Sequence, residues 1–133
     1  NNNPFHFKGF IDVILKTKKD NKINILDLKS TSWGWRQERK SDAITTYQLT
    51  LYKHFYAQKH KIDPNNIETF FVLLKRTANN DNIEIFRVTS GQKKTDNALK
   101  LVENCLKYIE KGFYPKNRTS CTYCKFFKTE HCK

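Results

Sequence analysis

The sequence has few acidic residues and no long apolar run. Only 13 residues are Asp or Glu, against 25 Lys and Arg, so the formal net charge of the 133-residue chain is +12. Such an excess favours a polyanionic partner, with nucleic acid as the first candidate, although lysines can also serve only to solvate a surface. No window is long and apolar enough to span a membrane and no secretory signal is visible, so we expect an intracellular protein, in the cytoplasm or nucleoid, without a membrane partner.

Internal repeats, low-complexity linkers and an initial Met are also missing. Without repeats or linkers, a chain of this length is expected to form one domain with a real core. The hydrophobic residues make up 38% of the chain, and ten Phe and six Tyr are available to fill that core. Because the sequence begins with residues 1–4, Asn-Asn-Asn-Pro, we expect a fragment or a trimmed protein.

Apolar periodicity predicts an α/β domain with the element order β-β-α-β-β-α, a mixed central sheet flanked by helices. The expected strands are residues 5–16, 23–30, 68–75 and 83–89, and the expected helices are residues 41–59 and 95–111. Turn residues at 18–21 and 79–82 predict two hairpins. Residues 23–30 are apolar on both faces, which predicts a central strand that is covered on both sides.

Each expected helix carries an apolar stripe. The first stripe consists of Ile44, Tyr47, Gln48, Leu51 and Phe55, and the second of Ala98, Leu101, Val102, Cys105 and Ile109. Gln48 is the polar member of its stripe, and an unpaired buried amide costs about 1–3 kcal/mol. Gln48 should therefore have a partner, either a polar group on the sheet or a neighbouring backbone carbonyl.

Two acids and a lysine stand where the first two strands should point inward. Charges rarely occupy such positions unless they are paired or hold a metal. On neighbouring strands Asp12 and Asp27 would repel each other, and a divalent cation relieves that repulsion. Mg²⁺ or Mn²⁺ would find oxygen ligands in the two carboxylates, the backbone carbonyl of Leu28 and a scissile phosphate. Lys29, on the same face as Asp27, would position the attacking water and neutralise developing charge. The alternative is a solvated strand end.

The segment after the second strand, residues 30–40, is expected to be a loop rich in aromatic and cationic side chains. The candidates for nucleic-acid binding are Trp33, Trp35, Arg36, Arg39 and Lys40. Beside a phosphate-cleaving centre they would stack on bases and bind the phosphate backbone. Equally, both indoles can cover the core under a long loop.

Three motifs follow one another along the chain: Gly9-Phe10-Ile11-Asp12, Asp27-Leu28-Lys29 and Gln48-x-x-x-Tyr52. In this order they resemble the motifs of the PD-(D/E)XK nuclease superfamily, specifically its RecB-like exonuclease branch. The resemblance implies a restriction-endonuclease-like core in which Asp12 and Asp27 are metal ligands and Lys29 is catalytic. By the same likeness, Gln48 and Tyr52 orient the site or contact DNA.

The resemblance also sets expectations for activity and partners. It implies a Mg²⁺- or Mn²⁺-dependent deoxyribonuclease, an exonuclease of DNA repair, recombination or replication, with a helicase or another replication protein as a further partner. Relatives of this type carry a His or an acidic residue on a helix before the first core strand. Only five residues precede His6, so we expect the chain to lack that helix. A non-catalytic nuclease-like module that binds DNA or a helicase is the alternative.

Three of the four cysteines lie close to the C-terminus: Cys121, Cys124 and Cys132. Without a secretion signal, such crowding indicates metal or cluster ligation rather than disulfides, and a Cys-x-x-Cys turn is a good half-site for zinc or iron. The tail resembles that of RecB-like nucleases with a [4Fe-4S] cluster, which would pin residues 113–133 onto a core of residues 1–112. Zinc and free thiols are the alternatives. Cys105 is expected to be a core thiol, and His131 is the other candidate for the fourth ligand.

Overall fold

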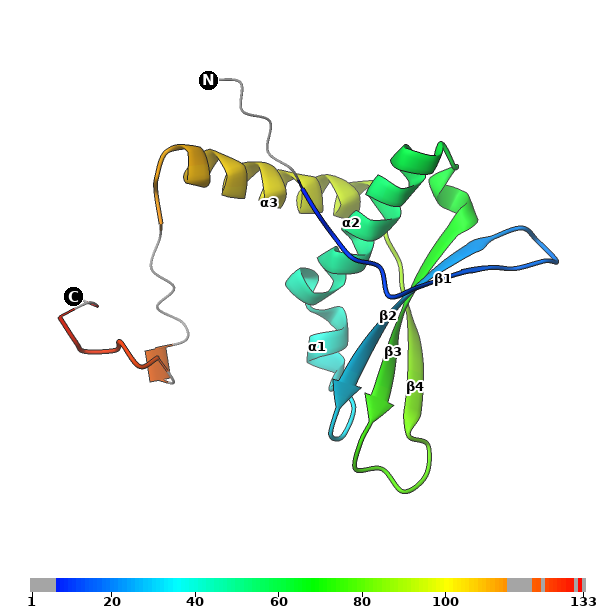
Figure 1. Cartoon of the computed structure of the whole chain (residues 1–133), viewed down its shortest axis with the longest axis horizontal. Helices are drawn as coiled ribbons and strands as arrows, with labels where there is room; N and C mark the ends of the chain where they lie inside the picture. The colour runs from blue at the N-terminus through cyan, green and yellow to red at the C-terminus, as the bar shows by residue number, and fades with distance from the viewer. Residues whose placement is uncertain (1–6, 115–120, 123, 131, 133) are drawn as a thin grey trace. The chain divides into compact units, whose positions relative to one another are not determined.

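The computed structural model describes residues 7–114, 121–122, 124–130 and 132, and the chain forms two compact units, residues 1–102 and 103–133. Figure 1 shows the elements along the chain. The strands are β1 (Val13–Lys16), β2 (Ile23–Thr31), β3 (Ile67–Lys75) and β4 (Ile83–Val88). The helices are α1 (Gln37–Ser41), α2 (Ala43–His60), a 3₁₀ turn η1 (Pro64–Asn66) and α3 (Gln92–Glu110), which runs from the first unit into the second.

The first unit is built on a mixed sheet with the strand order β1-β2-β3-β4. The two hairpins, β1–β2 and β3–β4, are antiparallel, whereas β2 and β3 pair in parallel. A parallel pair needs a crossover connection, and here α1, α2 and η1 supply it. The α/β fold with a mixed, helix-flanked sheet and the element order are therefore confirmed, with α1 added inside the expected loop.

The first strand is much shorter than expected. Phe5 and His6, which the sequence assigns to it, lie outside the described residues, and the ladder with β2 begins only at the pair Val13 and Leu26. The Asp12 side chain explains this end, because its Oδ2 accepts the Leu28 N–H at 2.8 Å and so occupies the position of a backbone partner. The prediction that Asp12 lies within a strand is wrong by one residue.

Helix α2 covers one face of the sheet with a different stripe from the expected one. Its buried residues are Thr46, Leu49, Thr50 and Ala57, whereas Ile44 is 66% exposed. The threonines can be buried because their hydroxyls donate to carbonyls one turn back, Thr50 Oγ1 to Thr46 O at 3.1 Å and Thr46 Oγ1 to Asp42 O at 3.0 Å. Periodicity of apolar residues alone could not reveal a threonine-lined face.

The core lies between α2 and the face of the sheet made by alternate residues of β2 and β3. Its fully buried members include Ile25, Leu49, Ile67, Phe71 and Leu73. Trp35, from the segment after β2, closes one end of this core. Its ring centroid lies 5.1 Å from that of Phe71 and 5.9 Å from that of Phe86.

The other face of the sheet is largely uncovered. Leu28 on β2 is 41% exposed, and Ile83 and Ile85 on β4 are 57% and 61% exposed. The register places Leu28 beside Val72, and Val72 beside Ile85, so these side chains share one face. The central position of β2 is confirmed, but the expectation that both of its faces are covered is wrong.

In the second unit, α3 ends where the sequence indicated. Gly112 has φ +61°, a left-handed conformation that glycine adopts without strain. Its N–H donates to Ile109 O at 3.0 Å, and the Phe113 N–H donates to Tyr108 O at 2.9 Å.

Cys105 is exposed, which corrects the expectation of a core thiol. No helix among the described residues is long and apolar enough to cross a membrane.

Candidate active site

The candidate site is centred on Asp27, which lies at an inward position of β2 and is only 2% exposed. Its Oδ1 accepts a hydrogen bond of 3.0 Å from Gln48 Nε2 on α2. Its Oδ2 forms an ion pair with Lys29 Nζ at 2.6 Å, two residues further on the same face, and has no other polar partner in the described part of the chain. Asp27 and Lys29 thus lie on the same face of β2, and Gln48 reaches that face from α2.

Asp12 joins this group across the hairpin. The Thr17 N–H donates to Lys22 O, so in the antiparallel register Leu26 and Leu28 direct their main-chain groups toward β1. Beyond Val13 no strand partner remains for Leu28, and the Asp12 carboxylate takes its N–H. The Leu28 carbonyl faces the same open edge, because the N–H and C=O of one residue in a strand point to the same neighbour.

The electrostatics agree with this proximity. Burial raises the pKa of Asp27 above its usual value, Lys29 opposes the rise, and the negative charge of Asp12 adds to it. A carboxylate that is destabilised by burial and by a second carboxylate is expected to gain from a cation placed between the two. The two carboxylates therefore lie close enough for the negative charge of Asp12 to raise the pKa of Asp27.

Gln48 has the partner that a buried amide requires, and it also reaches a second site residue. Its Nε2 lies 3.1 Å from the hydroxyl of Tyr52, one helical turn further along α2. The ring of Tyr52 packs closely against Gly9, where an added Cβ would lie 2.9 Å from Tyr52 Cε1. The residues of all three motifs therefore meet in one place, and Gly9 is the residue that allows the chain to pass the tyrosine ring.

The oxygen atoms of the site fit a hard divalent cation. The described residues contain no cluster of three or more His, Cys, Asp and Glu side chains that could hold a metal ion, so Asp12 and Asp27 stand as a pair. Both offer carboxylate oxygens, and Asp27 Oδ2 is buried and, among the described residues, is paired only with the Lys29 ammonium group. Mg²⁺ commonly binds one or two carboxylates and keeps several waters, so a pair is an adequate protein contribution.

The aromatic and cationic segment after β2 divides into two roles. Trp33 is 81% exposed and Arg36 is exposed, so both are available to a ligand. Trp35 belongs to the core, and the Arg39 guanidinium lies 4.3 Å from its ring centroid. Lys40 forms an ion pair with Glu84. Base stacking is thus open to Trp33, whereas Trp35 takes the alternative role of covering the core.

The cysteine tail keeps its predicted turn. The Cys124 N–H donates to Cys121 O at 3.0 Å, and the Cys132 N–H donates to Thr129 O at 3.0 Å. All four cysteines are free, and the three in the tail are not gathered as a metal-binding group in the described part of the chain. The candidate ligand His131 lies outside the described residues.

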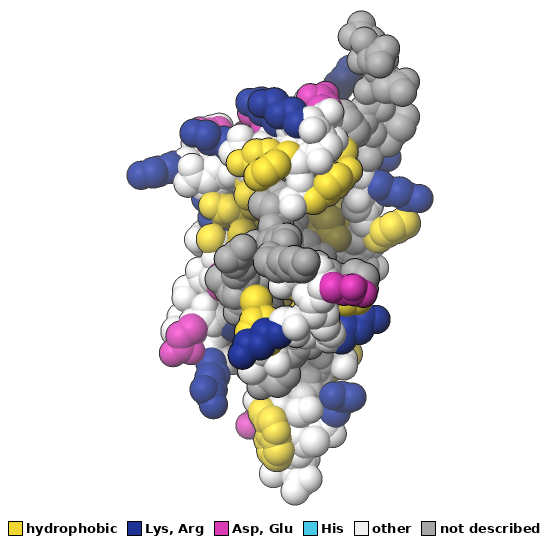
Figure 2. Space-filling model, turned by 90° about the vertical axis from the view of Figure 1, so that its left-hand side faces the viewer, with side chains coloured by type: hydrophobic (Ala, Val, Ile, Leu, Met, Phe, Trp, Pro, Cys, Tyr) yellow, Lys and Arg dark blue, Asp and Glu magenta, His cyan; other side chains and the backbone are white. Residues whose placement is uncertain are grey.

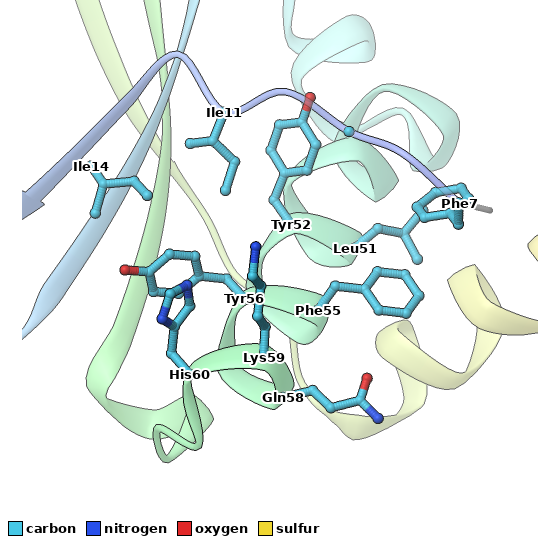
Figure 3. Close-up of a pocket in the computed structure, with 11 residues that line it drawn as sticks. Phe7, Ile11, Ile14, Leu51, Tyr52, Phe55, Tyr56, Gln58, Lys59 and His60 are labelled. Atoms are coloured by element: carbon cyan, nitrogen blue, oxygen red, sulfur yellow. The ribbon is translucent and has the colours of Figure 1, made fainter.

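A groove next to the site was not anticipated from the sequence. It has a volume of about 610 Å³ and lies between residues 7–14 and the second half of α2. Figure 3 shows its apolar and aromatic lining, which includes Phe7, Ile11, Leu51, Tyr52, Phe55 and Tyr56. The aromatic residues of α2 at positions 52, 55 and 56 are the signal in the sequence, but Phe55 is predicted only as part of the stripe, Tyr52 only as part of a motif, and Tyr56 as neither.

The fold and the site together define an α/β domain with two carboxylates and a lysine where the β1–β2 hairpin stops pairing. A family model for the PD-(D/E)XK nuclease superfamily matches residues 2–128, and the chain belongs to this superfamily. Its members are generally nucleases and typically use Mg²⁺ or Mn²⁺.

The solved structures add a distant likeness. One is described as the crystal structure of SSO0001, with 16% sequence identity and a TM-score of 0.47; the match covers 87% of this chain and 46% of that one. The chain thus spans less than half the length of that protein. No curated protein matches the sequence.

Proposed function

We propose that this protein is a metal-dependent deoxyribonuclease that hydrolyses phosphodiester bonds at the site formed by Asp12, Asp27 and Lys29. The single observation that carries the proposal is the buried Asp27 carboxylate, which contacts Lys29 at 2.6 Å and Gln48 at 3.0 Å beside a second acid. A buried acid with a raised pKa is an unfavourable element of a fold unless it has a task.

The roles follow from these contacts. Asp12 and Asp27 would hold Mg²⁺ or Mn²⁺, and the carbonyl of Leu28, at the open edge of β2, would assist them. When bound, the ion would polarise the phosphate and lower the pKa of a bound water. Gln48 fixes the orientation of the Asp27 carboxylate through Oδ1, which leaves Oδ2 for the reacting side. Lys29, which is about one-third exposed, orients the water and offsets negative charge that develops on the phosphate oxygens.

A DNA substrate is supported by the charge of the chain and by its family. Figure 2 shows Lys and Arg side chains spread over one face of the molecule, in line with the net charge of +12. Proteins with this balance gain affinity for a phosphate backbone by releasing counterions. The RecB-like motif order supports exonuclease action in DNA repair, recombination or replication, and a helicase as partner.

The test is cleavage of end-labelled and circular DNA, single- and double-stranded, in Mn²⁺ and in EDTA. We expect the wild-type protein to cut in Mn²⁺ and not in EDTA. The Lys29→Ala variant should cut at least 100-fold more slowly, because the lysine stabilises charge in the transition state. The matched control is Lys18→Ala, which removes a lysine from the turn between β1 and β2, away from the site, and should cut normally. Unimpaired cutting by Lys29→Ala would refute the assigned role, and circular DNA that stays intact while linear DNA is degraded would support an exonuclease.

One observation favours a second candidate, a nuclease-like module that binds DNA or a helicase without chemistry. The described residues supply two carboxylates and no third ligand of the kind that relatives carry before the first strand. Under this alternative the protein binds DNA in a salt-dependent manner but does not cut it in Mn²⁺, even when a longer version of the chain is tested. Binding without cutting would replace the first proposal with this one.

We further propose that the tail holds a [4Fe-4S] cluster through Cys121, Cys124 and Cys132. The hydrogen-bonded turn from Cys121 to Cys124 supports it, because a Cys-x-x-Cys turn suits two thiolates of one cluster. Protein purified without oxygen should be brown and contain iron and sulfide. Zinc alone in elemental analysis would show that the tail is a zinc site.

A further inference from the structure

The groove beside the site has an unusual combination of linings. Its walls are apolar and aromatic, formed by residues such as Leu51, Phe55 and Tyr56 of α2 and Ile11 of the opposite segment. One cation reaches into it, since Figure 3 shows the Lys59 amino group raised between Tyr52 and Tyr56. A purely apolar partner would bury that charge without compensation, which is costly.

The groove shares a wall with the candidate active site. Tyr52 forms part of its wall while its hydroxyl lies 3.1 Å from Gln48 Nε2, and Gln48 binds Asp27. The opposite wall includes Gly9 and Ile11, which directly precede Asp12. A polymer held at the two carboxylates can therefore reach this groove within a few monomers of the reacting group.

From these observations we infer that the groove binds one unpaired nucleotide of a single-stranded polynucleotide, next to the phosphate that is cut. This inference rests on the proposed nuclease function and names its substrate as a strand with at least one unstacked base. The base lies against the aromatic and aliphatic wall, and its phosphate is attracted by Lys59. A volume of about 610 Å³ lies in the range of about 300–1,000 Å³ typical of ligand pockets, ample for a base and its sugar.

The test uses binding, which does not require catalysis. Single-stranded oligonucleotides that each lack the base at one position are titrated with the full chain in EDTA, with the complete oligonucleotide as reference. Because one base–aromatic contact contributes about 1–3 kcal/mol, we expect the affinity to fall about 5- to 100-fold for the oligonucleotide that lacks the bound base. Equal affinity for every oligonucleotide would overturn the inference.

Variants then assign the effect to the groove. Phe55→Leu should reduce the penalty for the missing base several-fold, and Ile14→Trp, which fills the groove from an exposed strand position, should remove it. Ile44→Ala, on the outer face of the same helix, is the control and should keep the full penalty. Circular dichroism verifies that each variant is folded. Because Phe55→Leu removes an aromatic wall and Ile14→Trp fills the groove, the test remains valid if one of the two variants does not fold.

The outcomes separate this inference from the function on which it rests. If the wild-type protein cuts DNA in Mn²⁺ but the groove variants retain the full penalty, the nuclease stands and the groove binds something else, such as a protein segment. If the wild-type protein never cuts but the groove variants lose the penalty, the nucleotide site stands and the catalytic proposal fails.

Discussion

At the scale of single residues, the molecule is organised around one buried carboxylate. Asp27 has three neighbours that act on its charge: Gln48 and Lys29 favour it, whereas Asp12 opposes it. Burial is the largest influence and raises its pKa. The native protein therefore holds a proton on Asp27 at pH values where the unfolded chain has already released it.

This difference predicts how stability depends on pH. Because the native state binds more protons, the contribution of Asp27 to stability falls as the pH rises above about 3.9, the usual pKa of Asp. The variant Asp27→Asn removes the buried charge but keeps an acceptor for Gln48. In the absence of metal at pH 7 it should be at least as stable toward urea as the wild-type protein, with a weaker pH dependence between pH 4 and 7, yet inactive.

The control for that measurement is Asp81→Asn, a substitution in an exposed turn that should leave the pH dependence of the wild-type protein unchanged. A loss of stability in Asp27→Asn with the wild-type pH dependence would contradict the assigned origin of the pKa rise. The ion pair with Lys29 would then be the dominant influence.

A second prediction concerns Gln48. The variant Gln48→Leu preserves the volume of the side chain but leaves Asp27 Oδ1 without a donor, so the carboxylate becomes harder to ionise. Activity should fall, and the acidic limb of the pH–rate profile should move to higher pH, because metal binding requires the ionised acid. Gln37→Leu, on exposed α1, is the matched control. A lower rate with an unchanged pH profile would indicate a role for Gln48 outside the ionisation of Asp27.

Much of the residue-scale pattern could be predicted from the sequence. Asp27 and Lys29 share a face because alternate residues of a strand do so. Gln48 could be identified because it is a polar residue in the apolar stripe of a helix that packs against the sheet. The Asp12 contact could not be predicted in the same way. It depends on where β1 stops pairing, and a side chain that replaces a backbone partner leaves no mark in apolar periodicity.

At the scale of elements, the segment between β2 and α2 assigns different tasks to two similar residues. Trp35 is buried against Phe71 and Phe86, and Trp33 is exposed two residues earlier. The sequence could not separate them, because two indoles in a loop with arginines are compatible with either a ligand surface or a core cover. Packing against β3 and β4, which are distant in sequence, determines that Trp35 and not Trp33 is buried.

The two tryptophans therefore predict opposite phenotypes. Trp35→Ala opens a cavity in the core and should lower the free energy of unfolding by about 3–5 kcal/mol. Trp33→Ala should change it by less than about 0.5 kcal/mol, but it should weaken the binding of single-stranded DNA about 5- to 100-fold. Urea unfolding and fluorescence anisotropy measure the two effects. A destabilised Trp33→Ala protein with full DNA affinity would reverse the assignment.

The stripe of α2 illustrates where element-scale prediction ends. The position of the helix is predicted to within two residues, and the helix begins after Asp42, whose side chain accepts the Thr45 N–H at 2.7 Å. The buried face was not, because Thr46 and Thr50 are polar by composition but satisfy their hydroxyls within the helix. A helix face of small side chains, whose hydroxyls are bonded within the helix, packs against the sheet because it lets the two approach closely. The order of apolar residues in the sequence does not encode that distance.

At the scale of the whole molecule, metal binding should be linked to folding. The two carboxylates come together only when the hairpin is paired, so an ion held as proposed would bind the native state and not the unfolded chain. At a Mg²⁺ or Mn²⁺ concentration ten times the Kd, this linkage contributes about 1.4 kcal/mol, which for a chain of this size raises the Tm by roughly 5 °C.

Differential scanning fluorimetry with increasing Mn²⁺ tests this expectation. Asp27→Asn should show little or no shift, and Asp81→Asn should shift like the wild-type protein. An equal shift in all three proteins would locate the stabilising ion elsewhere, for example in the cysteine tail.

The parallel pairing of β2 and β3 has a consequence for the newly made protein. Asp27 is neighboured in the sheet by Phe71, which the ribosome adds 44 residues later, from position 27 to position 71. At about 5–20 residues per second, roughly 2–9 s separate their synthesis. A nascent chain that ends at residue 66 already contains Asp12, Asp27, Lys29, Gln48 and Tyr52, but the strand that packs them has not been made. The buried surroundings of Asp27 therefore form only after β3 has been made, and an interrupted translation product that ends before residue 67 carries all three motifs without the strand that buries them.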